Sequence, residues 1–157
     1  EIFLTRSREP FPDGSFDVEH YRAVHRHRFQ DVYEWAGQFR KIRIGKDGNW
    51  FCYPEFLEQN LCDLFERLAR CNYFSGVNRT DLPRRAALFL SELNAIHPFR
   101  EGNGRSQMSF LGLLLVNAGF VFRPENVVPN RILNAMILSF SGQLDPLQSV
   151  IRDLIAD

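Results

Sequence analysis

One short segment of the chain concentrates the residue types that act on phosphates. It reads HPFREGNGR and covers residues 97–105. Gly102 and Gly104 flank Asn103, and glycine lets the backbone adopt positive φ angles and approach a ligand closely. The segment runs into an apolar stretch from Met108 that predicts a helix, and the free N–H groups of a helix N-terminus bind anions. Residues 97–105 therefore predict a phosphate-binding loop.

The side chains of this loop add the groups that a transfer reaction needs. His97 has a pKa near neutrality and suits a general base, while Glu101 offers the hard oxygen ligands that Mg²⁺ prefers. Asn103 can donate its side-chain amide to a phosphate oxygen, and Arg105 supplies a fixed positive charge. The segment is neither a P-loop, since no Lys-Ser or Lys-Thr follows, nor a dinucleotide fingerprint, since a third glycine is absent. The set favours phosphoryl or nucleotidyl transfer.

The residues before the loop predict helices and one hairpin that position it. Residues 1–14 read as an irregular lead-in because they contain two prolines and a glycine. Residues 40–53 predict a β-hairpin, since Asp47-Gly48 is a tight-turn pair between alternating polar and apolar residues. A helix is expected from Asp17, with Gly37 as its C-cap. Its apolar stripe comprises Tyr21, His25, Phe29, Val32 and Ala36.

Four further helices are expected around the loop. One begins at Pro54, and its apolar stripe comprises Leu57, Leu61, Leu64 and Leu68. The next is capped by Asp81 and ends at His97, because Pro98 disfavours helical geometry in the residue before it. Two more cover residues 125–141 and 146–156, after the central apolar helix that follows the loop. The pattern predicts a mainly helical bundle with one hairpin.

Composition narrows the class of protein further. The chain has 157 residues, with 19 Lys and Arg against 19 Asp and Glu, so no cationic field favours nucleic acid or anionic membrane as a partner. Three cysteines, spaced ten and nine apart, fit neither a disulfide framework nor a zinc site. Asn117 and Gly119 interrupt the uncharged run 106–122, which is therefore expected to be a buried helix and not a membrane span. Without a signal-peptide pattern, the expected location is cytoplasmic.

The loop and its following residues, HPFREGNGRSQM, resemble the signature of the Fic family, His-x-Phe-x-Asp/Glu-Gly-Asn-Gly-Arg-x-x-Arg. Every specified position matches except the last, which is Met108. Residues 31–37, DVYEWAG, are similar to the end of the family's first helix, residues 40–53 to its substrate-docking flap, and residues 54–156 to its helical bundle. The resemblance implies a Fic-fold helical bundle with one β-hairpin flap over residues 15–157, preceded by the lead-in 1–14.

The resemblance also implies a reaction. Most Fic proteins transfer AMP from ATP to a Ser, Thr or Tyr hydroxyl of a target protein. By this resemblance His97 deprotonates the hydroxyl and Glu101 holds Mg²⁺ at the phosphates of ATP. The phosphate-binding residues are Gly102, Asn103, Gly104 and Arg105. The flap that docks the target is represented by Ile44, Gly45, Lys46, Asp47 and Gly48.

Met108 stands where the family pattern has an arginine that holds the γ-phosphate and pairs with the glutamate of an inhibitory helix. Methionine does neither, and losing one charged hydrogen bond costs about 1.5–3 kcal/mol, or roughly one to two orders of magnitude in rate. Three interpretations remain open. The chain is a weakened AMP transferase, a Fic-type transferase with another nucleotide or phosphate donor, or a nucleotide-binding pseudoenzyme.

The family's inhibitory pattern, Ser/Thr-x-x-x-Glu-Gly/Asn, is only partly matched within the chain. Thr5–Glu9 is followed by Pro10, and Ser15–Glu19 by His20. A small antitoxin-like inhibitory protein is therefore the expected partner besides the target protein. The sequence leaves open whether the chain is the toxin of such a pair or the catalytic domain of an effector delivered into a host cell.

Overall fold

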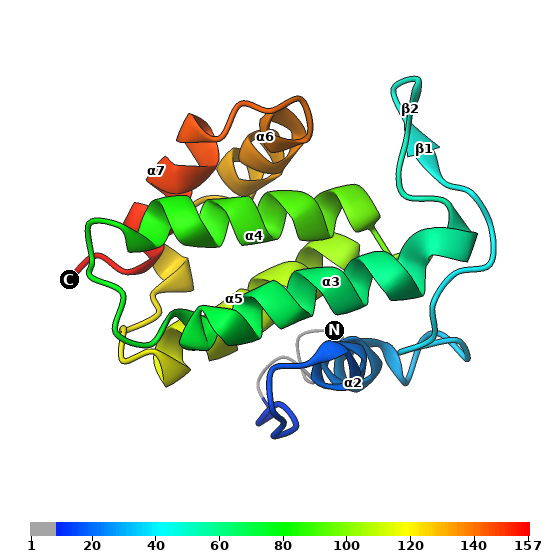
Figure 1. Cartoon of the computed structure of the whole chain (residues 1–157), viewed down its shortest axis with the longest axis horizontal. Helices are drawn as coiled ribbons and strands as arrows, with labels where there is room; N and C mark the ends of the chain where they lie inside the picture. Colours follow the sequence, from blue (N-terminus) through cyan, green and yellow to red (C-terminus); the bar gives the residue numbers. More distant parts are fainter. Residues whose placement is uncertain (1–8) are drawn as a thin grey trace.

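A computed structural model describes residues 9–157, and helices account for most of them (Figure 1). The two strands of the chain's hairpin are β1 (Gly45–Lys46) and β2 (Asn49–Trp50). The prediction of a mainly helical bundle with one hairpin is confirmed. The helices are α2 (Val18–Phe29), α3 (Leu57–Arg70), α4 (Leu82–Ile96), α5 (Asn103–Asn117), α6 (Pro129–Phe140) and α7 (Asp145–Leu154), with single 3₁₀ turns η1 (Pro54–Phe56), η2 (Asn72–Phe74) and η3 (Pro124–Asn126).

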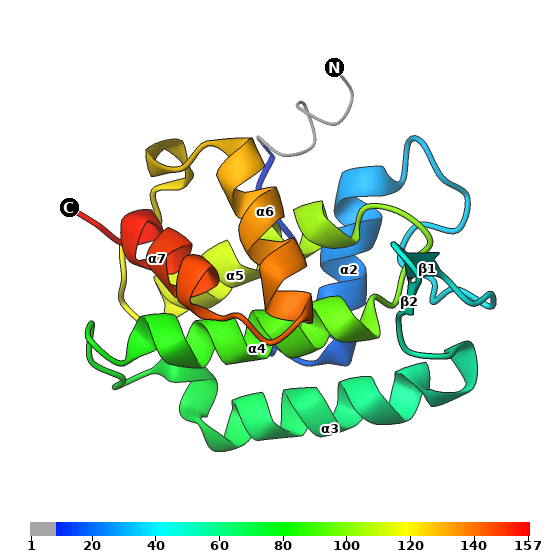
Figure 2. The same cartoon turned by 90° about the horizontal axis from the view of Figure 1, so that it is seen from above.

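Helix α4 lies in the middle of the bundle and contacts four other helices. It packs against α3 and α5 on one side and against the pair α6 and α7 on the other, while α2 packs against α5 (Figures 1 and 2). The loop between α4 and α5 emerges at the end of the bundle from which the hairpin projects (Figure 1). The fold thus brings residues 97–102 and the hairpin to the same end of the molecule.

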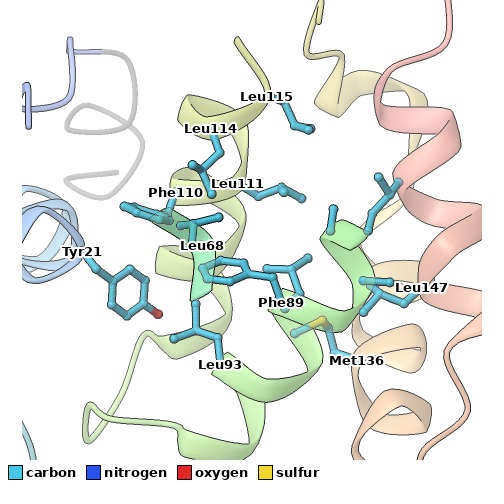
Figure 3. Packing of buried hydrophobic residues seen from close by; sticks show 14 of the residues in the cluster. Tyr21, Leu68, Phe89, Leu93, Phe110, Leu111, Leu114, Leu115, Met136 and Leu147 are labelled. Carbon is cyan, nitrogen blue, oxygen red and sulfur yellow. The ribbon is translucent and has the colours of Figure 1, made fainter. Parts of the chain in front are cut away.

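The core between these helices is apolar and rich in aromatic rings. Phe110 of α5 is fully buried and meets the ring of Tyr21 edge-on at 5.3 Å between centroids (Figure 3). The stripe predicted for α3 is confirmed, since all four of its leucines are at most 3% exposed. Burial of such side chains is the main favourable term in folding, so the core supplies a rigid frame for the loop at its end.

The first described helix is shorter than its apolar stripe predicts. Helix α2 begins after Asp17, whose carboxylate accepts from the His20 N–H at 2.9 Å, but it ends at Phe29, and Val32 is 43% exposed. The chain then turns back, and Gly37 takes a left-handed conformation with φ of 79° at the end of that turn and not as a helix cap. The stripe predicts too long a helix because hydrogen bonds hold Gly37 back against α2. The Gly37 N–H donates to His25 Nδ1 at 2.9 Å, and the Gly37 carbonyl accepts from Arg22 Nε at 2.8 Å.

The hairpin is also shorter than residues 40–53. Only Gly45 with Trp50 and Lys46 with Asn49 pair, in antiparallel register. Asp47 and Gly48 have φ angles of 53° and 80°, as a tight turn with two left-handed residues requires, so the turn prediction is confirmed.

One predicted helix cap and several predicted boundaries differ from those that the structure shows. Asp81 precedes α4, but its side chain makes no cap; instead its backbone N–H donates to Asn78 Oδ1 at 2.8 Å. The loop after α4 is shorter than residues 98–104, because α5 already begins at Asn103. Each of the last two helices is shorter than its predicted range.

The two partial inhibitory patterns form no separate helix that the structure describes. Ser15–Glu19 runs into the first turn of α2, and Thr5–Glu9 falls almost entirely outside the described residues. Within the described part of the lead-in, residues 9–14 adopt neither helix nor strand. None of the helices built by residues 9–157 is long and apolar enough to cross a membrane.

Candidate active site

His97 caps α4 in a strained backbone conformation. Its φ and ψ are 50° and 63°, in the left-handed region that a β-carbon disfavours. Its ring stacks on Phe51 with 3.8 Å between centroids and 6° between planes, and its Nδ1 is buried without a hydrogen-bond partner. Burial lowers the pKa of His97 to about 4; the backbone of Asn94 opposes that shift, and the nearby charges of Arg40 and Lys46 add to it. The imidazole is therefore neutral at pH 7 and able to accept a proton.

Phe99 anchors the loop two residues later. It is fully buried, and its ring stacks on His25 of α2 at 3.8 Å between centroids and 19° between planes. Tyr21 lies on the same ring at 5.5 Å. The loop is thus pinned by an aromatic side chain inserted between the α2 residues and the core.

His25 ties the loop to the segment after α2. The Gly37 N–H donates to His25 Nδ1 at 2.9 Å, which leaves the ring proton on Nε2, and Nε2 donates to the Glu101 carbonyl at 2.9 Å. Burial lowers the pKa of His25 to about 4, although the bond to Glu101 opposes that shift. His25 is a structural histidine with both nitrogens bonded.

Asn103 closes the loop on itself. Its Oδ1 accepts from the Phe99 N–H at 3.0 Å, its Nδ2 donates to the Phe99 carbonyl at 2.8 Å, and the residue is only 3% exposed. The amide that sequence reasoning assigns to phosphate is thus engaged with the backbone of the loop. Asn103 sets the turn that presents the N-terminus of α5.

Gly102 and Gly104 differ in the space around them. Gly102 precedes α5 with φ of 80°, and a β-carbon there would lie 2.4 Å from the ring of Phe29, so both conformation and space require glycine. A β-carbon on Gly104, in the first turn of α5, would have no atom within 4 Å. The space above the first turn of α5 is open. That turn contains no acidic side chain that would repel an anion at the positive end of the helix dipole.

Charged side chains surround this open N-terminus. Glu101 and Arg105 are exposed, and the Arg105 guanidinium lies 5.1 Å from the centre of the Phe29 ring. Burial and the neighbouring charge of Arg105 lower the pKa of Arg28, whose guanidinium bonds Ser109 of α5 at 2.9 Å. A helix N-terminus, arginines and a carboxylate are the kinds of group that bind phosphate oxygens and a divalent cation.

The fold brings all the loop residues of the predicted site together and holds the flap beside them. His97 caps α4, Glu101 and Gly102 lie in the connecting loop, and residues 103–105 form the first turn of α5. The flap tip, residues 45–50, is exposed, and Ile44 at its base is half-buried and accepts from the Phe51 N–H at 3.0 Å. The Cys52 N–H donates to the Ala95 carbonyl at 3.0 Å, which joins the flap to α4.

Sequence reasoning missed three residues that shape the site. Phe51 supports the ring of His97, and Phe29 fills the space against Gly102. Arg40 is only 3% exposed and donates to the His97 carbonyl from Nε at 2.7 Å. An arginine in a polar and apolar alternation reads as a solvated strand residue, so no local pattern signals its burial.

Comparison with known proteins places this site in a family. The model of the Fic/DOC family matches residues 15–115. A relative from Sinorhizobium fredii, described as "Probable protein adenylyltransferase y4lH", is 52% identical over 155 residues, which are 98% of this chain and 81% of that protein. The protein adenylyltransferase VbhT of Bartonella schoenbuchensis is 36% identical over 139 residues, 88% of this chain but 29% of that longer protein.

The fold is likewise similar to solved structures. The N-terminal Fic domain of a VirB-translocated Bep effector protein from Bartonella quintana, solved with bound ADP, superposes with a TM-score of 0.84. The two share 25% sequence identity, and the match covers 98% of this chain and 78% of that one.

Proposed function

This chain belongs to the Fic/DOC family, and from that membership we infer that it is a protein adenylyltransferase, which moves AMP from ATP to a hydroxyl of a target protein. The observation that carries the inference is the 52% identity to a relative of that description, over nearly all of this chain and four-fifths of the relative. The loop HPFREGNGR lies within the part matched by the family model. The roles of individual residues below are part of the proposal.

The phosphates of ATP are held at the N-terminus of α5. The open space over Gly104 leaves room for them against the backbone N–H groups of the first turn, where the helix dipole favours negative charge. Arg105 supplies a guanidinium to the β-phosphate side, where pyrophosphate leaves. Asn103 serves the same site indirectly, since its bonds to Phe99 set the turn.

Glu101 is the residue that fits a magnesium ion. No cluster of three His, Cys, Asp or Glu side chains occurs among residues 9–157, so a metal here takes one carboxylate, the phosphates and water. That ligand set is typical of Mg²⁺ at nucleotides. Glu101 would hold such an ion, which would neutralise part of the triphosphate charge.

His97 takes the proton from the target hydroxyl. Because its pKa is about 4 in the free protein, the ring is neutral and accepts a proton, and the negative charge of bound phosphates raises its basicity. The hydroxyl oxygen forms a bond to the α-phosphorus as its O–H bond breaks. The bond from the α-phosphorus to the bridging oxygen breaks, and pyrophosphate leaves.

The flap docks the target beside His97. Residues 45–50 are exposed and only two residue pairs close the hairpin, so the outer backbone groups of the flap are available to an extended segment of the target. Such pairing places few demands on the sequence of the target. Ile44, Lys46 and Asp47 contribute whatever side-chain preference the flap has.

Met108 distinguishes this chain from the family signature given above. Its side chain is half-buried and packs against the core, where an arginine at the same position would project a charge on the Arg105 face of α5. We expect ATP to be held without that contact, which weakens transfer by roughly one to two orders of magnitude. The substitution also removes the partner of an inhibitory glutamate.

Regulation and place of action complete the proposal. An inhibitor that covers this site is a separate, antitoxin-like protein whose hold does not depend on residue 108. The chain acts in the cytoplasm, either of the cell that makes it or, after delivery, of a host cell. The description of the Bartonella quintana relative as VirB-translocated supports the second setting.

Label transfer from α-labelled ATP with Mg²⁺ to proteins of a bacterial lysate tests this function. Wild type, His97→Ala and Met108→Arg are compared side by side. We expect protein-bound label in wild type, none in His97→Ala, and more in Met108→Arg. Label in Met108→Arg alone would show that ATP is not the natural donor, and γ-label instead of α-label on protein would overturn nucleotidyl transfer.

A further inference from the structure

Arg40 is a buried arginine whose guanidinium is surrounded by backbone carbonyls. It is 3% exposed, and no ion pair joins it to another residue in the range 9–157. A buried charge is costly unless hydrogen bonds replace its water. Nε donates to the His97 carbonyl at 2.7 Å, Nη1 to the Ile42 carbonyl at 2.7 Å, and Nη2 to the carbonyls of Ile96, at 3.1 Å, and Cys52.

These carbonyls belong to the two parts of the site that must meet. Ile96 and His97 carry the last carbonyls of α4, which lack partners within the helix and lie at the negative end of its dipole. Ile42 and Cys52 lie on the two legs of the flap, on either side of the paired strands. One guanidinium therefore fastens both legs of the flap to the end of α4.

The same contacts hold the strained backbone of His97. The left-handed conformation of this residue turns its carbonyl toward Nε of Arg40, and the Arg40 N–H donates to the Pro98 carbonyl at 2.9 Å. The ring of His97 stacks on Phe51, which directly precedes Cys52. Both the backbone and the ring of His97 thus rest on groups that Arg40 fastens.

We propose that Arg40 is a positioning residue for adenylyl transfer, which fixes the base His97 and the target-docking flap relative to each other. The proposal rests on the roles proposed above for His97 and the flap. Arginine is required because its planar fork reaches four carbonyls at once, whereas a lysine ammonium is a single point of charge. The guanidinium of Arg40 donates to protein carbonyls, so Arg40 acts in this proposal through His97 and the flap.

The test compares Arg40→Met and Arg40→Lys with wild type. Arg70→Met, which removes an exposed arginine from the far end of α3, is the control. At saturating ATP, we expect the rate of α-label transfer to lysate proteins to fall at least tenfold in Arg40→Met while KM for ATP stays within threefold. Arg40→Lys recovers part of the rate, and it serves as the test variant if Arg40→Met does not fold.

Two NMR measurements separate positioning from a merely structural role, and neither needs transfer activity. Arg40 and Lys46 are the charges that face His97, so in Arg40→Met the ring of His97 should titrate at higher pH. The amides of Phe51 and Cys52 should exchange at least tenfold faster. The ring signals of His25 and the exchange of the Gly37 amide, which report on the other end of the loop, should stay as in wild type.

A failure of the Arg40 proposal can be distinguished from a failure of the proposed adenylyltransferase function. If wild type transfers no label, the adenylyltransferase proposal fails while the NMR measurements still decide the fastening role of Arg40. Unchanged exchange at Phe51 and Cys52, or an unchanged transfer rate in Arg40→Met, would overturn positioning. Equal loosening at Gly37 and Cys52 would also overturn it, because Arg40 would then support the whole fold and not this junction.

Discussion

His25, a buried residue of α2, and His97, a half-buried residue at the end of α4, both contact the loop between α4 and α5, and they differ in what their rings contact. Burial lowers the pKa of each to about 4. His25 is bonded on both nitrogens and lies flat on Phe99, so its ring has no capacity left for chemistry. His97 stacks on Phe51, its Nε2 makes no hydrogen bond to another residue of the part of the chain that the structure describes, and its backbone conformation is strained.

The comparison shows that burial and a shifted pKa do not by themselves mark a catalytic histidine. The partners decide, since a ring with both nitrogens hydrogen-bonded stabilises the fold, whereas a ring whose Nε2 bonds no other residue retains the capacity to accept a proton there. The strained backbone of His97 also favours a functional role, because strained residues are common at functional sites. Substitutions should therefore distinguish residues that stabilise the fold, such as His25, from residues that act in transfer, such as His97.

The largest expected effect is that of His97→Ala on transfer. Removing a general base lowers the rate by about 100- to 10,000-fold, while ATP still binds at the α5 N-terminus. Label transfer from α-labelled ATP measures the rate, and the rise in melting temperature with ATP and Mg²⁺ measures binding. His27→Ala, a histidine on α2 outside the site, should stay within twofold of wild type. Transfer by His97→Ala at the wild-type rate would remove His97 from the mechanism.

His25→Ala should instead act on stability. The substitution empties space beside Phe99 and leaves the Gly37 N–H and the Glu101 carbonyl without their partner. We expect a loss of about 3 kcal/mol in the free energy of unfolding, measured by urea titration. Arg26→Ala, on the exposed face of the same helix, should change it by about 0.5 kcal/mol or less. A stability equal to wild type would contradict the structural role.

Acid should destabilise the protein through these two rings. An unfolded histidine has a pKa near 6.5, and both folded values are about 4, so the fold favours the neutral ring. The stability they contribute is complete above about pH 6.5 and is lost as the pH falls toward 4, up to about 3 kcal/mol for His25. Urea unfolding at pH 7.5, 6.0, 5.0 and 4.5 measures it. His25→Ala should show a shallower dependence, and a free energy independent of pH would refute the assignment.

The smallest effects are expected for Gly102 and Gly104. Gly102 should matter for the stability of the fold, and Gly104 for the binding of ATP. Gly102→Ala should destabilise the fold by about 1–3 kcal/mol because φ is 80° and Phe29 occupies the space. Gly104→Ala should leave the melting temperature unchanged or higher, since its β-carbon meets nothing, but should weaken ATP binding. Thermal unfolding with and without ATP measures both. Undiminished ATP binding by Gly104→Ala would move the phosphates away from this turn.

The local sequence predicted those features whose cause is local. The leucine spacing of α3 predicted the buried stripe, Asp47-Gly48 predicted the turn of the flap, and Pro98 predicted the end of α4. In each case, a short-range steric or amphipathic rule acts on neighbouring residues alone. The turn of the loop 97–105 was predicted for the same reason, because glycines and a helix start act on the local backbone, and its role as a phosphate site stays a prediction.

Long-range contacts decided the rest. The stripe through Val32 predicted a longer α2, but Gly37 must turn back to reach His25. Arg40 begins the predicted hairpin and no local pattern signals its burial, yet residues 42, 52, 96 and 97 converge on its guanidinium only after the chain has folded.

By itself, the sequence therefore determined the helical class, the position of the loop and the residue types available for transfer, because periodicity and turn chemistry are local. Only the tertiary structure decided which histidine is free to act and which is bonded, and which arginine joins the flap to the base. The physical reason is that the state of a buried polar group depends on its hydrogen-bond partners, and here those partners are distant in the chain.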